Sequence, residues 1–261
     1  MRVLVTGAAS GIGKATAAEL ARRGHEVVAT ARDPRLLDDL DVAARLRLDV
    51  TDPGSVAEVL DELAWVDVLV NNAAYAVGGP VEHVAMAHVE RMFDTNVLGP
   101  VRLIQAFVPG MRERGSGVVV NVCSVAGHVA QPLSGYYAAT KHALEALSES
   151  LYIEVGHFGV RVVVVEPGFI APGMKEHLAT AYPSAYDDLA AQLDHLEDKV
   201  LGGTRPGPQL VADEIAHAVE DGAGPLRRRV GDDAKMILAA REQMGDEQFE
   251  AAMREVVGLT W

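Results

Sequence analysis

Cysteine is almost missing from this chain. Cys123 is the single cysteine among 261 residues, so no disulfide can form within the chain. Such a composition is typical of proteins in a reducing compartment, and we expect a cytoplasmic location. No histidine motif accompanies Cys123, which is therefore expected to be a small core residue rather than a nucleophile.

Long apolar runs and positive charge are also scarce. No run approaches the roughly 18 apolar residues that span a bilayer, and residues 1–7 lack the apolar core of a secretory signal. Lys and Arg number 23 against 37 Asp and Glu, which gives a formal net charge of −14. This balance argues against the basic face of a nucleic-acid-binding protein. We expect a soluble protein that binds neither membranes nor nucleic acid.

Metal-ligand spacings are missing as well. The nine histidines show no pattern such as H-E-x-x-H, so we predict no metal site. His128 follows a predicted strand, where it could line a substrate pocket or lie exposed in a loop. Arg227, Arg228 and Arg229 form a short basic run, which a strand edge or a subunit contact explains better than nucleic acid does.

What the sequence does contain is an alternation of short apolar β-branched runs with longer amphipathic stretches. Strands that are apolar throughout are typical of a parallel sheet buried on both faces, and their alternation with helices indicates βαβ units. We predict a doubly wound, Rossmann-like α/β fold in a single domain, residues 1–261, with a lid at 169–208 and a C-terminal helical extension at 232–261. The predicted strands are 3–5, 27–29, 45–48, 66–70, 118–122, 160–165 and 226–230, and the predicted helices are 12–23, 55–63, 89–111, 137–158, 185–200, 233–241 and 246–257.

A glycine-rich turn, Thr6 to Gly13, joins the first predicted strand to the first helix. Glycines at such a turn let the backbone approach a pyrophosphate, and the helix N-terminus offers free N–H groups to the anion. The spacing departs from G-x-G-x-x-G, so the general dinucleotide template fits only loosely. A glycine-rich turn without a ligand is the alternative.

A tyrosine and a lysine four residues apart begin a long predicted helix. This spacing puts Tyr137 and Lys141 on one helix face, where an ammonium would stabilise a phenolate and lower its pKa toward working pH. Ser124 follows the strand at 118–122, at the sheet edge where ligands bind in such folds. Asn96 lies within the helix predicted at 89–111, where asparagine is unfavourable. A kink with a bound water, or a satisfied buried amide, would explain it.

Taken together, these motifs resemble the short-chain dehydrogenase/reductase family over about residues 1–230, and more narrowly its hydroxysteroid-dehydrogenase-like branch. The family's T-G-x-x-x-G-x-G corresponds to residues 6–13, its N-N-A-G to 71–74, its Asn-Ser-Tyr-Lys set to Asn96, Ser124, Tyr137 and Lys141, and its Pro-Gly to 167–168. Two positions depart from the pattern. Ala74 replaces a glycine, a small change, and Pro172 replaces a threonine that helps to hold the nicotinamide carboxamide.

The resemblance implies a mechanism. Tyr137 would exchange a proton with the carbonyl or hydroxyl oxygen, while Ser124 hydrogen-bonds the same oxygen. Lys141 would bind the nicotinamide ribose, and Asn96 would anchor a water of the proton relay. The cofactor would carry the hydride.

The resemblance also implies a cofactor site. Ala31 stands where NAD-specific members carry an aspartate. The following Arg32 resembles the NADP-preferring pattern, because a planar guanidinium can form two hydrogen bonds to a 2′-phosphate. Asp33 could instead hold the ribose, so NADP(H) is preferred and NAD(H) is the alternative. Asp49 resembles the contact to the adenine amino group, Asn71 and Ala73 the adenosine wall, and Ile170 the contact to the carboxamide. The full set of expected cofactor-binding residues is Thr6, Gly7, Ser10, Gly11, Ile12, Gly13, Arg32, Asp49, Val50, Asn72, Ala73, Tyr137, Lys141, Pro167, Gly168 and Ile170.

The leading hypothesis is therefore an enzyme that interconverts a ketone and a secondary alcohol, with a moderately apolar substrate. A non-redox step with the same Tyr-Lys pair, such as dehydration, isomerisation or cyclisation, is the second hypothesis. A cofactor-sensing protein without catalysis is the third, although a sensor needs no proton relay. The family implies a homodimer or homotetramer formed through the helices at 89–111 and 137–158. An apolar spacing at Leu178, Tyr182, Leu189, Leu193 and Leu196 indicates the inner face of a lid, or ordinary core.

Overall fold

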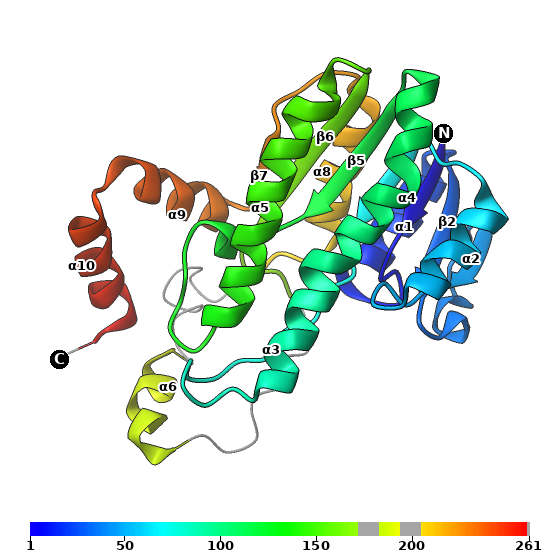
Figure 1. The fold of residues 1–261 in the computed structure, drawn as a ribbon. Helices are drawn as coiled ribbons and strands as arrows, with labels where there is room; N and C mark the ends of the chain where they lie inside the picture. Colours follow the sequence, from blue (N-terminus) through cyan, green and yellow to red (C-terminus); the bar gives the residue numbers. More distant parts are fainter. Residues whose placement is uncertain (172–182, 194–204, 260–261) are drawn as a thin grey trace.

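A seven-stranded parallel sheet forms the centre of the molecule. The structure is a computed structural model that describes residues 1–171, 183–193 and 205–259. The strand order is β3-β2-β1-β4-β5-β6-β7, with every pairing parallel (Figure 1), which confirms the predicted doubly wound α/β fold. The strands are β1 Arg2–Val5, β2 Glu26–Ala31, β3 Ala44–Arg47, β4 Val68–Asn71, β5 Gly117–Val122, β6 Val160–Pro167 and β7 Arg227–Val230.

Helices cover both faces of the sheet. Helices α1 and α8 lie on one face, and α2, α4 and α5 lie on the other (Figure 1). Side chains alternate along each strand, so Val3 and Val5 pack on the face of α1 and α8, while Leu4 packs on the opposite face. Burial on both faces explains why the central strands are largely apolar, whereas the edge strands β3 and β7 carry arginines. The helices are α1 Gly11–Arg22, α2 Pro53–Leu63, α3 Met86–Phe93, α4 Gly99–Arg114, α5 Gly135–Gly156, α6 Asp187–Leu193, α8 Gln209–Glu220, α9 Asp232–Gln243 and α10 Asp246–Val257.

The strand order reverses direction at β1, which lies between β2 and β4. A crevice forms beyond the carboxyl ends of the strands at such a switch point. The register aligns Val5 with Val70 and Val122 with Val165. Consequently the turns that follow β1, β4, β5 and β6 all open at one edge of the sheet.

The helix predicted at 89–111 is two helices separated by a π-helical turn, Asp94–Leu98. The turn brings the buried Asn96 side chain to the backbone of Tyr75 and to Thr140. π-turns inside helices occur frequently at functional sites. The expected local irregularity at Asn96 is therefore present, as a widened turn rather than a simple kink.

The sequence analysis missed α8. This helix packs on α1, and Val211, Ile215 and Val219 are buried at helical spacing. The signal was present, because Pro208 comes just before an apolar pattern with helical period.

The C-terminal predictions agree with α9 and α10 to within two residues at each end. For the helix predicted at 185–200, α6 confirms the first part, and the remainder lies outside the described residues. Pro172, Leu178, Tyr182 and Leu196 also lie outside them. In the described part of the chain no helix is both long and apolar enough to cross a bilayer.

Candidate active site

One large cavity, about 1630 Å³, opens at the carboxyl edge of the sheet. Its wall runs from the glycine turn after β1 to the helices α9 and α10. The expected site residues that line it are Gly7, Ser10, Gly11, Ile12, Arg32, Asp49, Val50, Asn72, Ala73, Ser124, Tyr137, Lys141, Pro167, Gly168 and Ile170. Thr6, Gly13 and Asn96 are not part of its lining, and their contacts show that they support the wall from behind.

The glycine turn depends on backbone conformations and close approaches that side chains would prevent. Gly7 and Gly11 have φ of +67° and +54°, a region that favours glycine. A Cβ on Gly13 would lie 2.4 Å from the Gly7 carbonyl oxygen, and one on Gly7 would lie 2.8 Å from the Ala73 Cα. The turn therefore packs tightly on itself and on the segment after β4, and the α1 N-terminus faces the cavity.

Thr6 and Asn72 lock these two segments together. The Thr6 hydroxyl accepts the backbone N–H groups of Asn72 and Ala73 at 2.9 and 3.0 Å. The Asn72 amide donates to the Thr6 carbonyl at 2.9 Å and to the Gly7 carbonyl at 3.2 Å. Asn71, expected in the adenosine wall, is buried instead and donates to Asn121 at 2.8 Å. The alternation along β4 puts it on the same face of the sheet as Leu69, and the register places it next to Asn121 of β5.

Tyr137 and Lys141 lie one turn apart at the start of α5. The Lys141 Nζ is 5.7 Å from the centre of the Tyr137 ring and donates to the Val122 carbonyl at 2.9 Å. Lys141 is 3 % exposed. Burial lowers the pKa of Lys141, and the nearby Glu145 carboxylate opposes that effect. The chain thus holds a buried amine beside a phenol on the wall of the cavity.

Ser124 stands at the end of the segment after β5 and begins a short 3₁₀ turn, Val125–Gly127. Its hydroxyl accepts the Ala126 N–H at 3.2 Å and lines the same cavity as Tyr137. A hydroxyl that accepts from the backbone keeps its own proton free to be donated. Ser124, Tyr137 and Lys141 therefore line one cavity, so the structure brings these three predicted site residues together.

Of the two surroundings expected for Asn96, the structure shows the buried amide with its hydrogen bonds satisfied. Its amide oxygen accepts the Tyr75 N–H at 2.8 Å, and its amide nitrogen donates to the Tyr75 carbonyl at 2.9 Å and to the Thr140 hydroxyl at 3.0 Å. This matches the satisfied buried amide. The side chain ties the segment after β4 to α5, and a water anchored at Asn96 stays a prediction.

Arg32 and Asp33, which follow β2, differ in whether their side chains already form an ion pair. Asp33 forms an ion pair with Arg35 at 2.8 Å, and the Arg35 side chain holds the pKa of Asp33 below its usual value. Arg32 is exposed on the cavity, with no ion pair to another described residue. Burial raises the pKa of Asp49, but hydrogen bonds from Thr51 and the charges of Arg32 and Arg47 outweigh it and leave a net lowering.

Asp233, in α9, is a supporting residue that the sequence analysis missed. Its carboxylate accepts the Phe169 N–H at 2.6 Å, and a Cβ on Gly168 would lie 2.0 Å from the same oxygen. Asp233 therefore fixes the Pro167–Gly168 segment where it lines the cavity. The sequence indicates a helix start at Gly231-Asp232-Asp233, but it carries no signal for the contact with Phe169, which lies 64 residues away.

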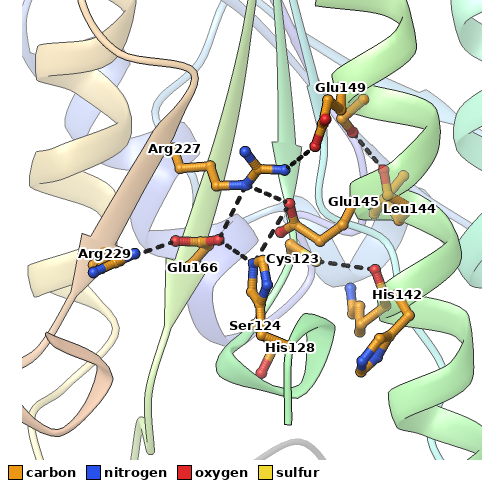
Figure 2. A network of polar contacts seen from close by, with 12 residues as sticks. Cys123, Ser124, His128, His142, Leu144, Glu145, Glu149, Glu166, Arg227 and Arg229 are labelled. Atoms are coloured by element: carbon orange, nitrogen blue, oxygen red, sulfur yellow. Dashed lines mark hydrogen bonds and ion pairs between the residues drawn. The ribbon is translucent and has the colours of Figure 1, made fainter. Parts of the chain in front are cut away.

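Cys123, His128 and the arginine run at 227–229 each have a definite place in the structure. Cys123 is buried, and burial raises its pKa well above the usual value, which fits a core residue. His128 does not line the cavity, because it turns toward Glu166 on the other side of the Ser124 turn (Figure 2). The arginine run forms β7, which is an edge strand of the sheet.

Comparisons with known proteins agree with this geometry. The family model "short chain dehydrogenase" matches residues 1–183. The 3-ketodihydrosphingosine reductase of Bacteroides thetaiotaomicron is 30 % identical over 262 residues, which covers 97 % of this chain and 96 % of that protein.

Solved structures are similar over nearly the whole chain. A short-chain dehydrogenase from Streptomyces avermitilis has 37 % identity and a TM-score of 0.84, covering 98 % of this chain and 96 % of that one. A gluconate 5-dehydrogenase from Burkholderia cenocepacia, in complex with NADP and tartrate, has 25 % identity and a TM-score of 0.75, covering 90 % and 95 %. The glycine turn, the Ser-Tyr-Lys wall and these likenesses lead to one conclusion: the chain belongs to the short-chain dehydrogenase/reductase family of oxidoreductase enzymes.

Proposed function

We propose that this enzyme interconverts a ketone and a secondary alcohol with NADP(H), and that Tyr137 is its acid–base residue. One observation carries the proposal. Ser124, Tyr137 and Lys141 line the same cavity as the glycine turn at the α1 N-terminus. A dinucleotide held at that turn and a carbonyl held at Ser124 would therefore occupy one space. The similarity to a protein named as a ketodihydrosphingosine reductase supports the ketone substrate.

The residues present fit a dinucleotide. Gly7 and Gly13 leave no room for a Cβ, which is the cradle that a closely approaching pyrophosphate requires. The free N–H groups of the α1 N-terminus would hold the phosphates. Asp49 lines the cavity after β3, next to the strand that precedes Arg32, and Pro167, Gly168 and Ile170 line it at and after the end of β6, next to the strand that precedes Ser124. Ala73 follows β4, between them. When bound, the nicotinamide supplies or accepts the hydride.

The protein's own residues would handle the proton. In reduction, the Tyr137 hydroxyl gives its proton to the carbonyl oxygen as that oxygen gains negative charge, and the Ser124 hydroxyl donates a hydrogen bond to the same oxygen. The Lys141 ammonium favours the phenolate that Tyr137 leaves behind. In oxidation, the phenolate takes the proton of the alcohol. The carbon thus gains or loses a hydride while its oxygen gains or loses a proton.

Arg32 supports NADP(H) over NAD(H). Its guanidinium is exposed on the cavity, whereas the Asp33 carboxylate is already engaged by Arg35. A planar guanidinium can bind a 2′-phosphate through two hydrogen bonds. The NADP-bound gluconate 5-dehydrogenase is consistent with this choice.

An apolar wall from the last two helices supports a moderately apolar substrate. Methionine is common there, and its flexible thioether adapts to varied apolar shapes. An apolar pocket with few polar groups is typical of small-molecule sites. The residues that α9, α10 and their junction contribute to the cavity are Met236, Ile237, Ala240, Met244, Phe249, Ala252, Met253 and Val256.

A cofactor-linked screen tests the proposal. Purified protein is mixed with a panel of ketones and secondary alcohols of increasing chain length, with NADPH or NADP⁺ and separately with NADH or NAD⁺. The proposal predicts a change in nicotinamide absorbance that matches product formation one to one. Product formed with no absorbance change would replace the proposal with a non-redox reaction on the same Tyr-Lys pair.

A further inference from the structure

A cluster of charged groups lies behind Ser124, on the side away from the cavity. Glu166 in β6 is 0 % exposed and Glu145 in α5 is 4 % exposed, and neither lines the cavity. The His128 Nε2 is 2.7 Å from a Glu166 oxygen and 3.8 Å from a Glu145 oxygen (Figure 2). His128 thus brings a titratable ring to two buried carboxylates.

Two arginines of β7 complete the cluster. The Arg227 Nε donates to Glu145 at 3.1 Å and lies 3.7 Å from Glu166, while its Nη2 donates to Glu149 at 2.6 Å. Arg229 lies 3.8 Å from Glu166, and its guanidinium also pairs with Glu242 of α9. Figure 2 shows Arg227 between the three glutamates.

Four glutamates face only two arginines in this cluster, so protonation of His128 reduces its net negative charge. The positive charge of Arg227 is shared by Glu145, Glu166 and the exposed Glu149. The positive charge of Arg229 is shared between Glu166 and the exposed Glu242. An uncompensated carboxylate in the interior is strongly unfavourable. A His128 imidazolium would offset part of the remaining negative charge next to Glu166, and burial raises the pKa of Glu145, which acts in the same direction. The hydrogen bond to Glu166 raises the pKa of His128, partly opposed by burial.

The cluster joins the three segments that build the active-site wall. His128 ends the turn that Ser124 begins, and the turn is short and hydrogen-bonded, with the Gly127 N–H donating to the Ser124 carbonyl at 2.8 Å. Glu166 directly precedes Pro167 in β6, while Glu145 follows Lys141 by one turn of α5. A contact between His128 and these carboxylates therefore fixes the Ser124 turn relative to α5 and to β6.

We propose that His128 is a positioning residue whose protonated ring clamps the Ser124 turn to Glu166 and Glu145 and so holds the Ser124 hydroxyl in register with Tyr137. The proposal rests on the proposed function, in which both hydroxyls act on one oxygen. A hydroxyl displaced by as little as an ångström can reduce turnover about a hundredfold. His128 acts only through Ser124, because it does not line the cavity.

A divalent cation is the competing occupant of this cluster. The donor atoms of His128, Glu145 and Glu166 lie within 4.8 Å of one another, which is close enough to share an ion. Arg227, however, places a guanidinium nitrogen 3.1 Å from Glu145 and 3.7 Å from Glu166. A positive group already stands at the carboxylates, so the geometry favours a proton on His128 over a metal ion.

The sign of the pH effect follows from the raised pKa of His128. A group whose pKa is higher in the folded state stabilises that state fully below its unfolded pKa, which is about 6.5 for histidine. The contribution is lost as the pH rises through the folded value. Each element packed against the ring presents a charged group: Glu145 from α5, Glu166 from β6, Arg227 and Arg229 from β7, and Glu242 from α9. The clamp should therefore loosen toward alkaline pH.

The test compares wild type with His128→Gln, which keeps a donor for Glu166 but cannot carry charge. His217→Gln, which removes an exposed histidine of α8, is the matched control. We measure kcat for both proteins at a series of pH values that covers the titration of His128, and we divide the wild-type value by the His128→Gln value. Both proteins contain Tyr137, so its titration cancels in this ratio. The proposal predicts a ratio of roughly 10 at acidic pH that falls toward about 1 at alkaline pH, with the cofactor KM unchanged. A ratio that is constant with pH overturns it.

A second readout does not depend on turnover. Hydrogen exchange of the backbone amides at 124–129, corrected for the intrinsic rate, is compared at about pH 6 and about pH 8.5. Wild type and His217→Gln should lose protection at the higher pH, and His128→Gln should be poorly protected at both. Equal protection in wild type and His128→Gln at about pH 6 overturns the clamp, even if no substrate is turned over and the proposed function itself fails. Binding of Zn²⁺ by wild type but not by His128→Gln, in calorimetry, also overturns it, in favour of a metal site.

Discussion

The Lys141 Nζ lies 5.7 Å from the centre of the Tyr137 ring while it donates to the Val122 carbonyl at 2.9 Å. The lysine is therefore held by β5 and directed at the phenol from one turn farther along α5. Stability alone gives no reason to bury a cation here, because replacing a buried charge with an apolar group of similar size is often neutral or stabilising; the proposed function gives Lys141 a role.

Lys141→Met separates a catalytic role of Lys141 from a purely structural one. The substitution removes the charge and keeps the length of the side chain, so we expect kcat to fall by about 10²-fold or more. Without the ammonium, the Tyr137 phenol should titrate nearer the usual value of about 10, so the remaining activity for alcohol oxidation should move to higher pH. Thermal unfolding should show an equal or higher Tm. A lower Tm with an unchanged pH profile would identify Lys141 as structural.

Arg32→Gln tests the choice of cofactor. Charge-assisted hydrogen bonds contribute about 1.5–3 kcal/mol, so kcat/KM with NADPH should fall roughly 10- to 100-fold, while kcat/KM with NADH should change little. Arg35→Gln is the reciprocal variant, because it frees the Asp33 carboxylate for a ribose hydroxyl and should improve the use of NADH. Wild type that uses NADH as well as or better than NADPH would refute the assignment.

Gly13→Ala tests the glycine turn. Its Cβ would lie 2.4 Å from the Gly7 carbonyl oxygen, so the turn must shift, at a cost of about 1–3 kcal/mol, and cofactor affinity should fall with it. Gly156→Ala is the control, because nothing lies within 4 Å of its added Cβ, and it should leave cofactor affinity unchanged. Urea unfolding and fluorescence titration with NADPH measure the two effects. Normal cofactor affinity in Gly13→Ala would place the dinucleotide elsewhere.

Met236→Gln tests the apolar wall. The side chain lines the cavity and is 54 % exposed, so stability should change little. Loss of apolar contact should lower kcat/KM for long apolar ketones about 3- to 10-fold, with the cofactor KM unchanged. Met86→Gln, at a 62 % exposed position outside the cavity lining, should behave as wild type. Equal behaviour of the two variants on every ketone would remove α9 from the substrate site.

The sequence predicts the fold and the reacting groups more fully than it predicts the residues that hold those groups in place. Val3 to Val5 and the other apolar strands carry a local signal, and Tyr137, Lys141 and Ser124 lie at motif spacings. Asp233, Glu145 and Glu166 carry no such signal, because each matters through a partner that is distant in the chain: Phe169 for Asp233, Arg227 for Glu145 and His128 for Glu166. Only the packing of β6, β7, α5 and α9 reveals these pairs.

At Asn96, too, the sequence predicts less than the structure shows. The sequence indicates an unusual residue in a helix, but the π-turn follows from the backbone of Tyr75 and the hydroxyl of Thr140, which the fold brings to its amide. The hydroxysteroid-like branch, the oligomeric state and the cytoplasmic location stay predictions, since none of them follows from the contacts within one chain.

Tyr137→Phe is the most direct test of the central claim. It removes only the hydroxyl oxygen and should leave the ring and the cavity wall in place. Tyr136→Phe, which removes the hydrogen bond from the neighbouring phenol to the Val81 carbonyl, is the matched control. The account predicts that Tyr137→Phe loses kcat by about 10²-fold or more while NADPH affinity stays close to wild type, and that Tyr136→Phe retains activity. Full turnover by Tyr137→Phe would contradict the account.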